Sequence, residues 1–264
     1  AVIGAGLLLS LAGPRSGVAA APPTAKPGTG ATAIVNVADA FTPEQEKAIG
    51  AIVRSYLLKN PEILIEVSQL LEQRQKAEKA EQQLKLISSQ RQEIFRSPHD
   101  FVMGDKDAKI TVVEYFDYNC GWCKRALGEV AKLVKEEPNV RVVLKEFPIF
   151  GEHSEYAALA AMAAREQGKY WDFHVAMMKA KRVTKDNVLK IAADVGLDVE
   201  KLKSDMAKPE YDAALKRNMA IAQAIGIEGT PGFVVDGRIN PGYMPVAALR
   251  QMIAEIREQG CKIC

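Results

Sequence analysis

The stretch FDYNCGWCK, residues 116–124, decides both the fold and the chemistry expected of this chain. Directly before it, ITVVEYF (110–116) is rich in β-branched and aromatic residues, which is typical of a buried strand. Directly after it, residues 124–135 have the pattern of a helix. The Cys-x-x-Cys motif therefore lies where a strand ends and a helix opens.

The remaining pattern of strands and helices indicates the fold class. Further strands are expected at residues 140–147, 233–235 and 238–239. A helical block is expected at 154–224 and a last helix at 246–259. The helical block has breaks near Gly168, Gly196 and Pro209, and Gly237 is expected to turn the last two strands into a hairpin. This order predicts an α/β fold whose sheet carries a large helical insertion.

The position of Cys120 predicts a reactive thiol. At a helix N-terminus, unpaired backbone amides and the helix dipole stabilise negative charge, so the thiolate is favoured and the thiol pKa falls. We expect Cys120 to attack a substrate disulfide and Cys123, one turn into the helix, to resolve the mixed disulfide. Gly121 and Trp122, between them, are expected to tune the thiolate and to contact the substrate.

A zinc site is the alternative use of a Cys-x-x-Cys pair, and it needs two further ligands. The three histidines, His99, His153 and His174, are scattered, and none has zinc-finger spacing to the pair. Redox chemistry is therefore the preferred interpretation, and no metal ligand is assigned. Two thiolates also suit Cu(I), a soft ion, so copper binding at Cys120 and Cys123 stays open.

Composition and the first residues predict an exported protein. The formal net charge is only +2 and the basic residues are spread along the chain, so nucleic-acid binding is not indicated. Residues 2–11 are apolar or small, Pro14 and Arg15 interrupt this run, and small residues follow at 18–21. This pattern predicts part of a signal peptide over 1–21, in a run too short to span a bilayer. A disordered tail or a membrane anchor is the alternative.

We assign the α/β domain to residues 97–264. The segment before it, residues 41–96, is expected to be helical. Residues 22–40 have the composition of a flexible linker. Helix starts at Thr42-Pro43 and Asn60-Pro61 introduce apolar stripes within 41–71, which we interpret as an oligomerisation element. Residues 72–96 then continue as an exposed arm, because 72–83 are polar on nearly every face. The alternative is that these helices fold back on the main domain.

Two motifs together resemble the DsbA-like thioredoxin superfamily. FDYNCGWCK resembles its active-site stretch, and Gly229-Thr230-Pro231-Gly232-Phe233 resembles its cis-proline loop. The resemblance covers 97–259 and implies a thioredoxin-like fold with a helical insertion. The helical segment at 41–96 further resembles the ScsC (suppressor of copper sensitivity) branch, which implies a homotrimer.

The resemblance also assigns residues at the cis-proline loop. It implies a cis bond between Thr230 and Pro231 beside the cysteines, and backbone hydrogen bonds from Thr230 to an extended substrate. A threonine before this proline resembles the isomerases of the superfamily. Taken alone, Gly-Thr-Pro-Gly is compatible with an ordinary turn.

Glu114 is the expected proton carrier. It lies six residues before Cys120, where thioredoxin-like proteins keep a buried acid, and strand alternation points it beneath the cysteines. A buried carboxyl has a raised pKa and can exchange a proton with Cys123. An exposed strand glutamate is the alternative, and Lys145 is an open choice for its charge partner.

A second motif, Cys261-Lys262-Ile263-Cys264, follows the last helix instead of opening one. The negative end of a helix dipole disfavours a thiolate there. We expect a mobile accessory disulfide or thiol pair without an assigned role.

These features predict a periplasmic thiol–disulfide oxidoreductase, an enzyme acting as a disulfide isomerase or reductase on misfolded or oxidised exported proteins. Isomerisation needs reduced Cys120, and the resemblance implies a membrane reductant of the DsbD or ScsB type. The alternatives are a dithiol oxidase that introduces disulfides and a Cu(I)-binding copper-tolerance protein.

Overall fold

The computed structural model describes residues 41–263. The expected signal peptide (1–21), the expected linker (22–40) and Cys264 lie outside these residues. The described residues fall into two compact units, 41–67 and 68–263.

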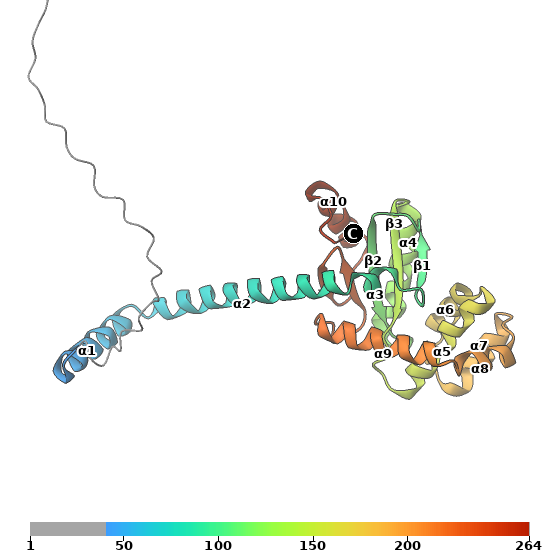
Figure 1. The fold of residues 1–264 in the computed structure, drawn as a ribbon, viewed down its shortest axis with the longest axis horizontal. Helices are drawn as coiled ribbons and strands as arrows, with labels where there is room; N and C mark the ends of the chain where they lie inside the picture. Colours follow the sequence, from blue (N-terminus) through green and yellow to red (C-terminus); the bar gives the residue numbers. More distant parts are fainter. Residues whose placement is uncertain (1–40, 264) are drawn as a thin grey trace, which may run out of the picture. The chain divides into compact units, whose positions relative to one another are not determined.

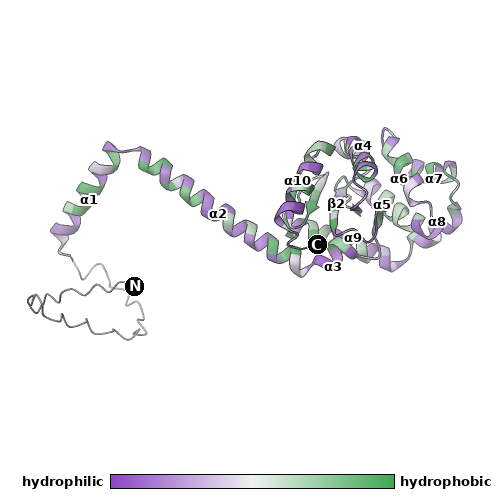
Figure 2. Ribbon diagram, turned by 90° about the horizontal axis from the view of Figure 1, so that it is seen from above, coloured by the Kyte–Doolittle hydropathy of each residue, from purple (hydrophilic) through white to green (hydrophobic). Residues whose placement is uncertain are grey.

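The first unit contains α1 (Pro43–Lys59) and the start of α2 (Glu62–Ser89). Thr42 caps α1 as expected: its side chain accepts from the Gln45 amide, Gln45 returns the bond, and Pro43 occupies the first turn. Asn60 ends α1. Hydrophobic positions recur along α1, where the ribbon is green in Figure 2. Large apolar side chains of this unit are exposed: Ile49, Ile52, Val53, Tyr56, Leu58, Leu64, Ile65 and Val67.

The second unit is an α/β domain around one sheet, which confirms the predicted fold class (Figure 1). Its strands are β1 (Phe101–Gly104), β2 (Ile110–Phe116), β3 (Val140–Glu146), β4 (Gly232–Val235) and β5 (Arg238–Pro241). They lie in the order β1-β3-β2-β4-β5. Only β2 and β3 run parallel among these strands, and the other neighbours are antiparallel.

The helices of this domain include the predicted insertion between β3 and β4. After α2 they are α3 (Arg91–Arg96), α4 (Gly121–Glu136), α5 (Glu152–Ala164), the 3-10 turn η2 (Arg165–Gln167), α6 (Tyr170–Lys179), α7 (Lys185–Asp194), α8 (Val199–Met206), α9 (Pro209–Ala224) and α10 (Val246–Gln259). The insertion breaks at Gly168, Gly196 and Pro209 as expected, and also between Lys179 and Lys185.

Two apolar clusters cover the two faces of the sheet. The larger joins side chains of β2 and β3 to α4, α10 and the insertion, and it includes Cys123. The smaller lies on the other face and includes Ile87, Ile94 and Phe95 from α2 and α3. We expected an exposed arm as far as Arg96. Residues 72–82 are exposed, but the burial of Ile94 and Phe95 shows that the end of this segment packs on the sheet.

The C-terminal segment is anchored instead of mobile, which corrects our expectation. Asp236, in the β4–β5 turn, accepts hydrogen bonds from the amides of Lys262 and Ile263 at 2.8 and 2.6 Å. The Ile263 side chain is buried in the smaller cluster. Cys261 is disulfide-bonded. In the part of the chain that is described, no helix has the length and hydropathy of a membrane span.

Candidate active site

Cys120 lies at the start of α4, as predicted. It is the N-cap residue, with extended backbone, and its Sγ accepts a hydrogen bond from the Cys123 amide at 3.4 Å. The motif is positioned by β2, which ends at Phe116 and leads into the helix through a four-residue loop, residues 117–120. Both cysteines are free thiols in this structure.

The environment of Cys120 stabilises its thiolate. The pKa of Cys120 is lowered to about 6, chiefly by a hydrogen bond from the Cys123 thiol. Burial opposes this shift, while Thr230 and the backbone amides of Cys123 and Trp122 add to it. At neutral pH most of Cys120 is therefore ionised, which is the nucleophilic form of a cysteine.

Cys123 has the opposite character. Its side chain is fully buried beneath the helix start. Burial raises its pKa above the ordinary value, and the hydrogen bond to Cys120 and the charge of Glu114 raise it further. The pair therefore combines one ionised sulfur with one shielded thiol.

The cis-proline loop meets the cysteines through the sheet. The Thr230–Pro231 bond is cis, as the resemblance implied. In the register of β2 with β4, Gly232 lies opposite Tyr115, so the loop before β4 reaches the end of β2. The Cys120 thiol donates to the Thr230 carbonyl at 3.2 Å. This carbonyl is thus within reach of the reactive sulfur.

Glu114 is buried on the face of β2 that α4 covers. It shares that face with Val112 and Phe116, which pack in the same cluster as both cysteines. Burial raises the pKa of Glu114 to about 8, and the Cys120 charge adds to the rise. Lys145 is not its charge partner: in the register it pairs with Tyr115, on the other face, and its ion pair is with Asp100.

Trp122 forms an exposed surface beside Cys120. Its indole is 56% exposed and lies 5.4 Å from the Tyr243 ring, measured between centroids. The Arg125 guanidinium lies 5.5 Å and 5.3 Å from the centroids of these two rings. Gly121 is also exposed, and a Cβ there would meet no atom within 4 Å. This side of the motif is therefore open to a large partner.

The sequence analysis missed the residues that hold the loop before Cys120. The buried Asp117 carboxylate accepts from the Asn119 amide at 2.7 Å, the Ser154 hydroxyl at 2.8 Å and the Phe150 amide at 3.1 Å. The Asn119 side chain bonds across to Val183 in the helical insertion. The bond from the Asn119 backbone amide to the Asp117 carboxylate, two residues earlier, forms an Asx turn. Aspartate is a residue type that favours such turns, so the sequence carries a weak signal for it.

A buried polar cluster under the loop was also missed. Oε1 of Glu146 accepts from Tyr118 Oη at 3.1 Å and from Tyr170 Oη at 2.9 Å. Tyr118 Oη also lies 3.1 Å from His174 Nδ1. Burial raises the pKa of Glu146 well above its ordinary value and lowers the pKa of His174 to about 3, so burial favours the neutral form of both side chains.

Comparison with known proteins identifies the family. Residues 111–254 match the DSBA-like thioredoxin domain, and residues 45–78 match the copper resistance protein ScsC N-terminal domain. The chain belongs to the DsbA-like thioredoxin family. The fold, with its helical insertion and N-terminal helices, is that of this family of thiol–disulfide oxidoreductases.

Solved structures include relatives of both parts. A thioredoxin-like oxidoreductase from Silicibacter pomeroyi is 46% identical, with a TM-score of 0.62 over 64% of this chain and 98% of that one. Salmonella enterica Typhimurium BcfH is 31% identical, with a TM-score of 0.65 over 83% and 98%. A linker-deletion mutant of Proteus mirabilis ScsC is 26% identical, with a TM-score of 0.63 over the same shares.

Curated relatives include longer proteins. The Na(+)/H(+) antiporter NhaA 3 of Salinispora tropica is 29% identical over 170 residues, which are 61% of this chain and 26% of that protein. The chain thus spans about a quarter of the length of the first curated relatives it matches. A probable disulfide bond formation protein D of Bacillus anthracis is 26% identical over 72% of its length.

Among residues 41–263, no group of three or more His, Cys, Asp or Glu side chains is arranged to hold a metal ion. Cys120 and Cys123 remain a pair of sulfurs that suits a two-coordinate soft ion such as Cu(I).

Proposed function

We propose that this chain is a periplasmic thiol–disulfide isomerase or reductase that acts on exported proteins. The observation that carries the proposal is the asymmetry of the cysteine pair: Cys120 is ionised at neutral pH, while Cys123 is buried and protonated. Such a pair attacks with one sulfur and resolves with the other.

The reaction begins when the Cys120 thiolate attacks one sulfur of a substrate disulfide. A mixed disulfide forms and the second substrate sulfur leaves as a thiolate. If that thiolate attacks another disulfide of the substrate, and the last displaced sulfur releases Cys120, the substrate is isomerised without net oxidation. Cys120 then returns as a thiolate, and no electrons are exchanged with a further partner.

Reduction of the substrate follows if Cys123 attacks first. Cys123 must lose its proton, and the ionised Glu114 beneath the pair accepts it. The Cys123 thiolate then attacks Cys120, the substrate sulfur bonded to Cys120 leaves as a thiolate, and Cys120 and Cys123 form a disulfide. The substrate has gained two electrons, so an external dithiol reductant, of the membrane-bound DsbD or ScsB type, must restore the reduced pair.

Substrate contacts are assigned to the surface around Cys120. We assign Trp122 and Gly121 to one side of the substrate and the backbone of Thr230 to the other. The exposed indole supplies apolar contact to unfolded chains, and the Thr230 carbonyl, whose oxygen lies 3.2 Å from the Cys120 sulfur, offers an acceptor to an extended segment.

Self-association through the N-terminal helices completes the proposal, with a trimer as the expected state. Support comes from the exposed apolar side chains of 41–67 and from the match of 45–78 to the ScsC N-terminal domain. An oligomer presents several reactive thiolates to one misfolded substrate, which favours repeated exchange over single oxidation.

Refolding of scrambled ribonuclease separates the candidate functions. Catalysed recovery of activity by the reduced protein, lost in Cys120→Ala, supports the isomerase. Rapid oxidation of reduced ribonuclease without isomerisation would instead favour a dithiol oxidase. In cells, thiol trapping should find Cys120 mostly reduced, and a mostly oxidised pair would contradict the proposal.

Copper binding is a second candidate because two thiols adjoin in the motif and because one matched domain is named for copper resistance. Anaerobic titration with Cu(I) tests it. One ion bound per chain, lost in Cys120→Ala, supports a site at Cys120 and Cys123, and equal binding by that variant excludes it.

A further inference from the structure

A cavity of about 770 Å³ lies away from the cysteines, beside the edge strand β1. It is lined by Arg96, residues 98–102 and Lys106, and by residues of β3 and the helical insertion. Arg141 lines it from the start of β3, where it pairs with Thr111 in the register, whereas Cys120 follows the other end of β2. The cavity therefore belongs to no part of the redox site.

Arg141 is the unusual residue of this cavity. Its side chain is only 5% exposed, yet Nε and Nη1 have no hydrogen-bond partner. Its remaining nitrogen, Nη2, donates to the Phe95 carbonyl at 2.7 Å. The two nitrogens without acceptors lose their hydration uncompensated, so an anion placed against them would be favoured.

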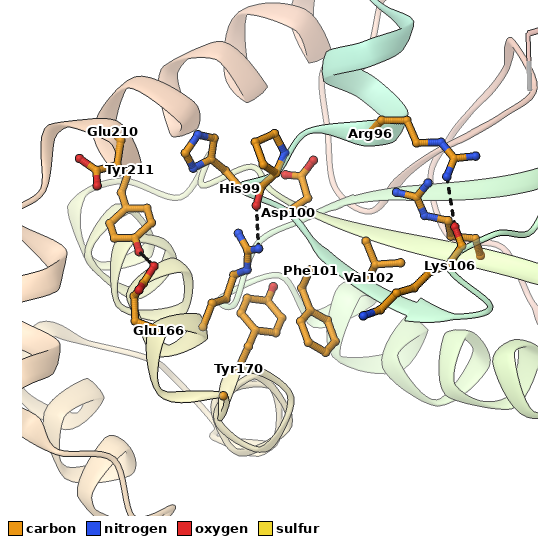
Figure 3. A pocket seen from close by; sticks show the side chains of 14 residues that line it. Arg96, His99, Asp100, Phe101, Val102, Lys106, Glu166, Tyr170, Glu210 and Tyr211 are labelled. Carbon is orange, nitrogen blue, oxygen red and sulfur yellow. Dashed lines mark hydrogen bonds between the residues drawn. The ribbon is translucent and has the colours of Figure 1, made fainter.

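Further cations lie on the same side of the cavity. Figure 3 shows Arg96 and Lys106 together at one end, and Arg96 Nη1 donates to the Lys106 carbonyl at 3.2 Å. Both side chains are exposed, so they can rotate to admit a ligand. The charge of Arg96 also lowers the pKa of Arg141, after burial as the larger cause, which indicates that the two guanidinium groups are close.

Among the described residues, the carboxylates of the cavity form no ion pair with these cations, although the charge of Asp100 favours the charged form of Arg141. Asp100 is paired with Lys145, and Glu166 accepts from Tyr211 Oη at 2.7 Å. Glu166, Glu210 and Tyr211 lie together at the end away from Arg96 (Figure 3). Within residues 41–263, neither Arg96 nor Arg141 has a carboxylate at ion-pair distance.

We propose that this cavity binds a small molecule through a carboxylate or phosphate group held by Arg141 and Arg96. A planar guanidinium offers parallel donors that match either group, and two of the Arg141 donors are uncommitted. Between the basic and acidic ends, Phe101 stacks on Tyr170 with centroids 4.4 Å apart and gives the remainder of the ligand an apolar wall.

Calorimetric titration of the full chain tests the proposal, with inorganic phosphate and succinate as separate probes at constant ionic strength in chloride. We expect saturable binding of at least one probe at one site per chain. Arg141→Met should weaken it by roughly ten- to a hundred-fold, the effect of losing a charge-assisted hydrogen bond. Preference for phosphate or succinate distinguishes the two anion chemistries.

The controls separate a built site from general charge effects. Arg96→Met, at an exposed position, tests the same site without a buried change, and it should also weaken binding. Arg74→Met removes the same charge from α2, outside the cavity, and Cys120→Ser removes the redox thiol, so both should bind as the parent does. Absence of saturable binding, or equal binding by the Arg74 and Arg141 variants, would overturn the proposal.

Discussion

Two cysteines three residues apart have opposite chemistry here because they meet different surroundings. Both cysteines lie in the larger apolar cluster, but the Cys120 sulfur accepts a hydrogen bond at the helix start, whereas the Cys123 side chain is fully buried under the helix. Hydrogen bonding to the charged form lowers a pKa, and desolvation of the charged form raises it. We therefore propose Cys120 as the nucleophile and Cys123 as the resolving thiol.

Glu114 extends this asymmetry into the strand beneath. With a pKa of about 8, it is mainly protonated at neutral pH, although an exposed glutamate would be ionised. It can therefore take up a proton only in the fraction of molecules in which it is ionised, and that fraction rises with pH. Resolution by Cys123 should accordingly accelerate as pH rises toward about 8.

Glu114→Gln should change how stability depends on pH. Because the folded pKa exceeds the unfolded value of 4.5, the folded carboxyl retains its proton between 4.5 and about 8 while the unfolded one loses it. The free energy of unfolding therefore falls as pH rises through this window. The glutamine variant lacks this loss and should gain a few kcal/mol relative to its parent at the upper end, at about 1.4 kcal/mol per unit of pKa shift.

Urea unfolding at pH 5 and pH 8 measures this effect. Both proteins should carry Cys120→Ser, so that ionisation of Cys120 does not contribute. A difference in unfolding free energy between the two proteins that stays constant with pH would contradict the buried, protonated state of Glu114.

The residues predicted from the sequence share a local signal. Cys120 and Cys123 are recognisable from their motif, Pro231 from its loop, and Glu114 from its spacing in a strand. Arg141 and Asp117 were missed as important residues because what makes them so is distant in the sequence: Asp117 bonds Ser154, and Arg141 bonds the Phe95 carbonyl.

At the scale of elements, the strands and helices with a clear pattern of buried residues were predicted best. The bounds expected for β2 and α10 agree with the structure, because a β-branched run and an amphipathic run have clear ends. The strand β1 was not expected, since FVMG is four residues long, includes a glycine and lies at the sheet edge. Its pairing with β3 supplies what the local pattern lacks.

The end of α2 and the short helix α3 show a second limit of sequence patterns. Their apolar residues are few and follow a long polar stretch, so they were interpreted as part of an exposed arm. Ile87 and Ile94 are nonetheless fully buried against the sheet. A few apolar residues on one side of a helix are therefore enough to hold it against a sheet whose facing side chains are apolar.

Ile94→Ala tests this packing. Removal of a buried isoleucine side chain costs about 2–5 kcal/mol through lost burial and the remaining cavity. We expect a loss in this range by urea unfolding. Gln92→Ala, at an exposed position of the same helix, should change the unfolding free energy by less than about 0.5 kcal/mol. Equal, small effects of both substitutions would show that α3 does not contribute to the core.

At the scale of the whole molecule, the N-terminal unit presents more apolar surface than a solvated helix needs. Ile52 and Leu64 are 68% and 60% exposed within a single chain. Contiguous exposed apolar side chains of this kind mark interaction surfaces. Their match to the ScsC N-terminal domain supports the interpretation that copies of the chain cover them.

The double variant Ile52→Glu, Leu64→Glu should dissociate the assembly, because a charge buried without a partner is costly. Sedimentation velocity should give a multiple of the 28.8 kDa chain mass for the parent and the single mass for the variant. Gln73→Glu adds a charge at a polar, exposed position of α2 and should leave the assembly intact. A parent protein that sediments as a single chain would contradict self-association.

The reactivity of Cys120 is the claim on which the account of the molecule depends. Its most direct test is the rate of alkylation of Cys120 by iodoacetamide as a function of pH, with the modified residue identified by mass spectrometry. The rate should rise with pH about a midpoint near 6, because the thiolate reacts and the thiol does not. A midpoint near the ordinary cysteine pKa of about 8.5, or no alkylation of Cys120, would contradict the account.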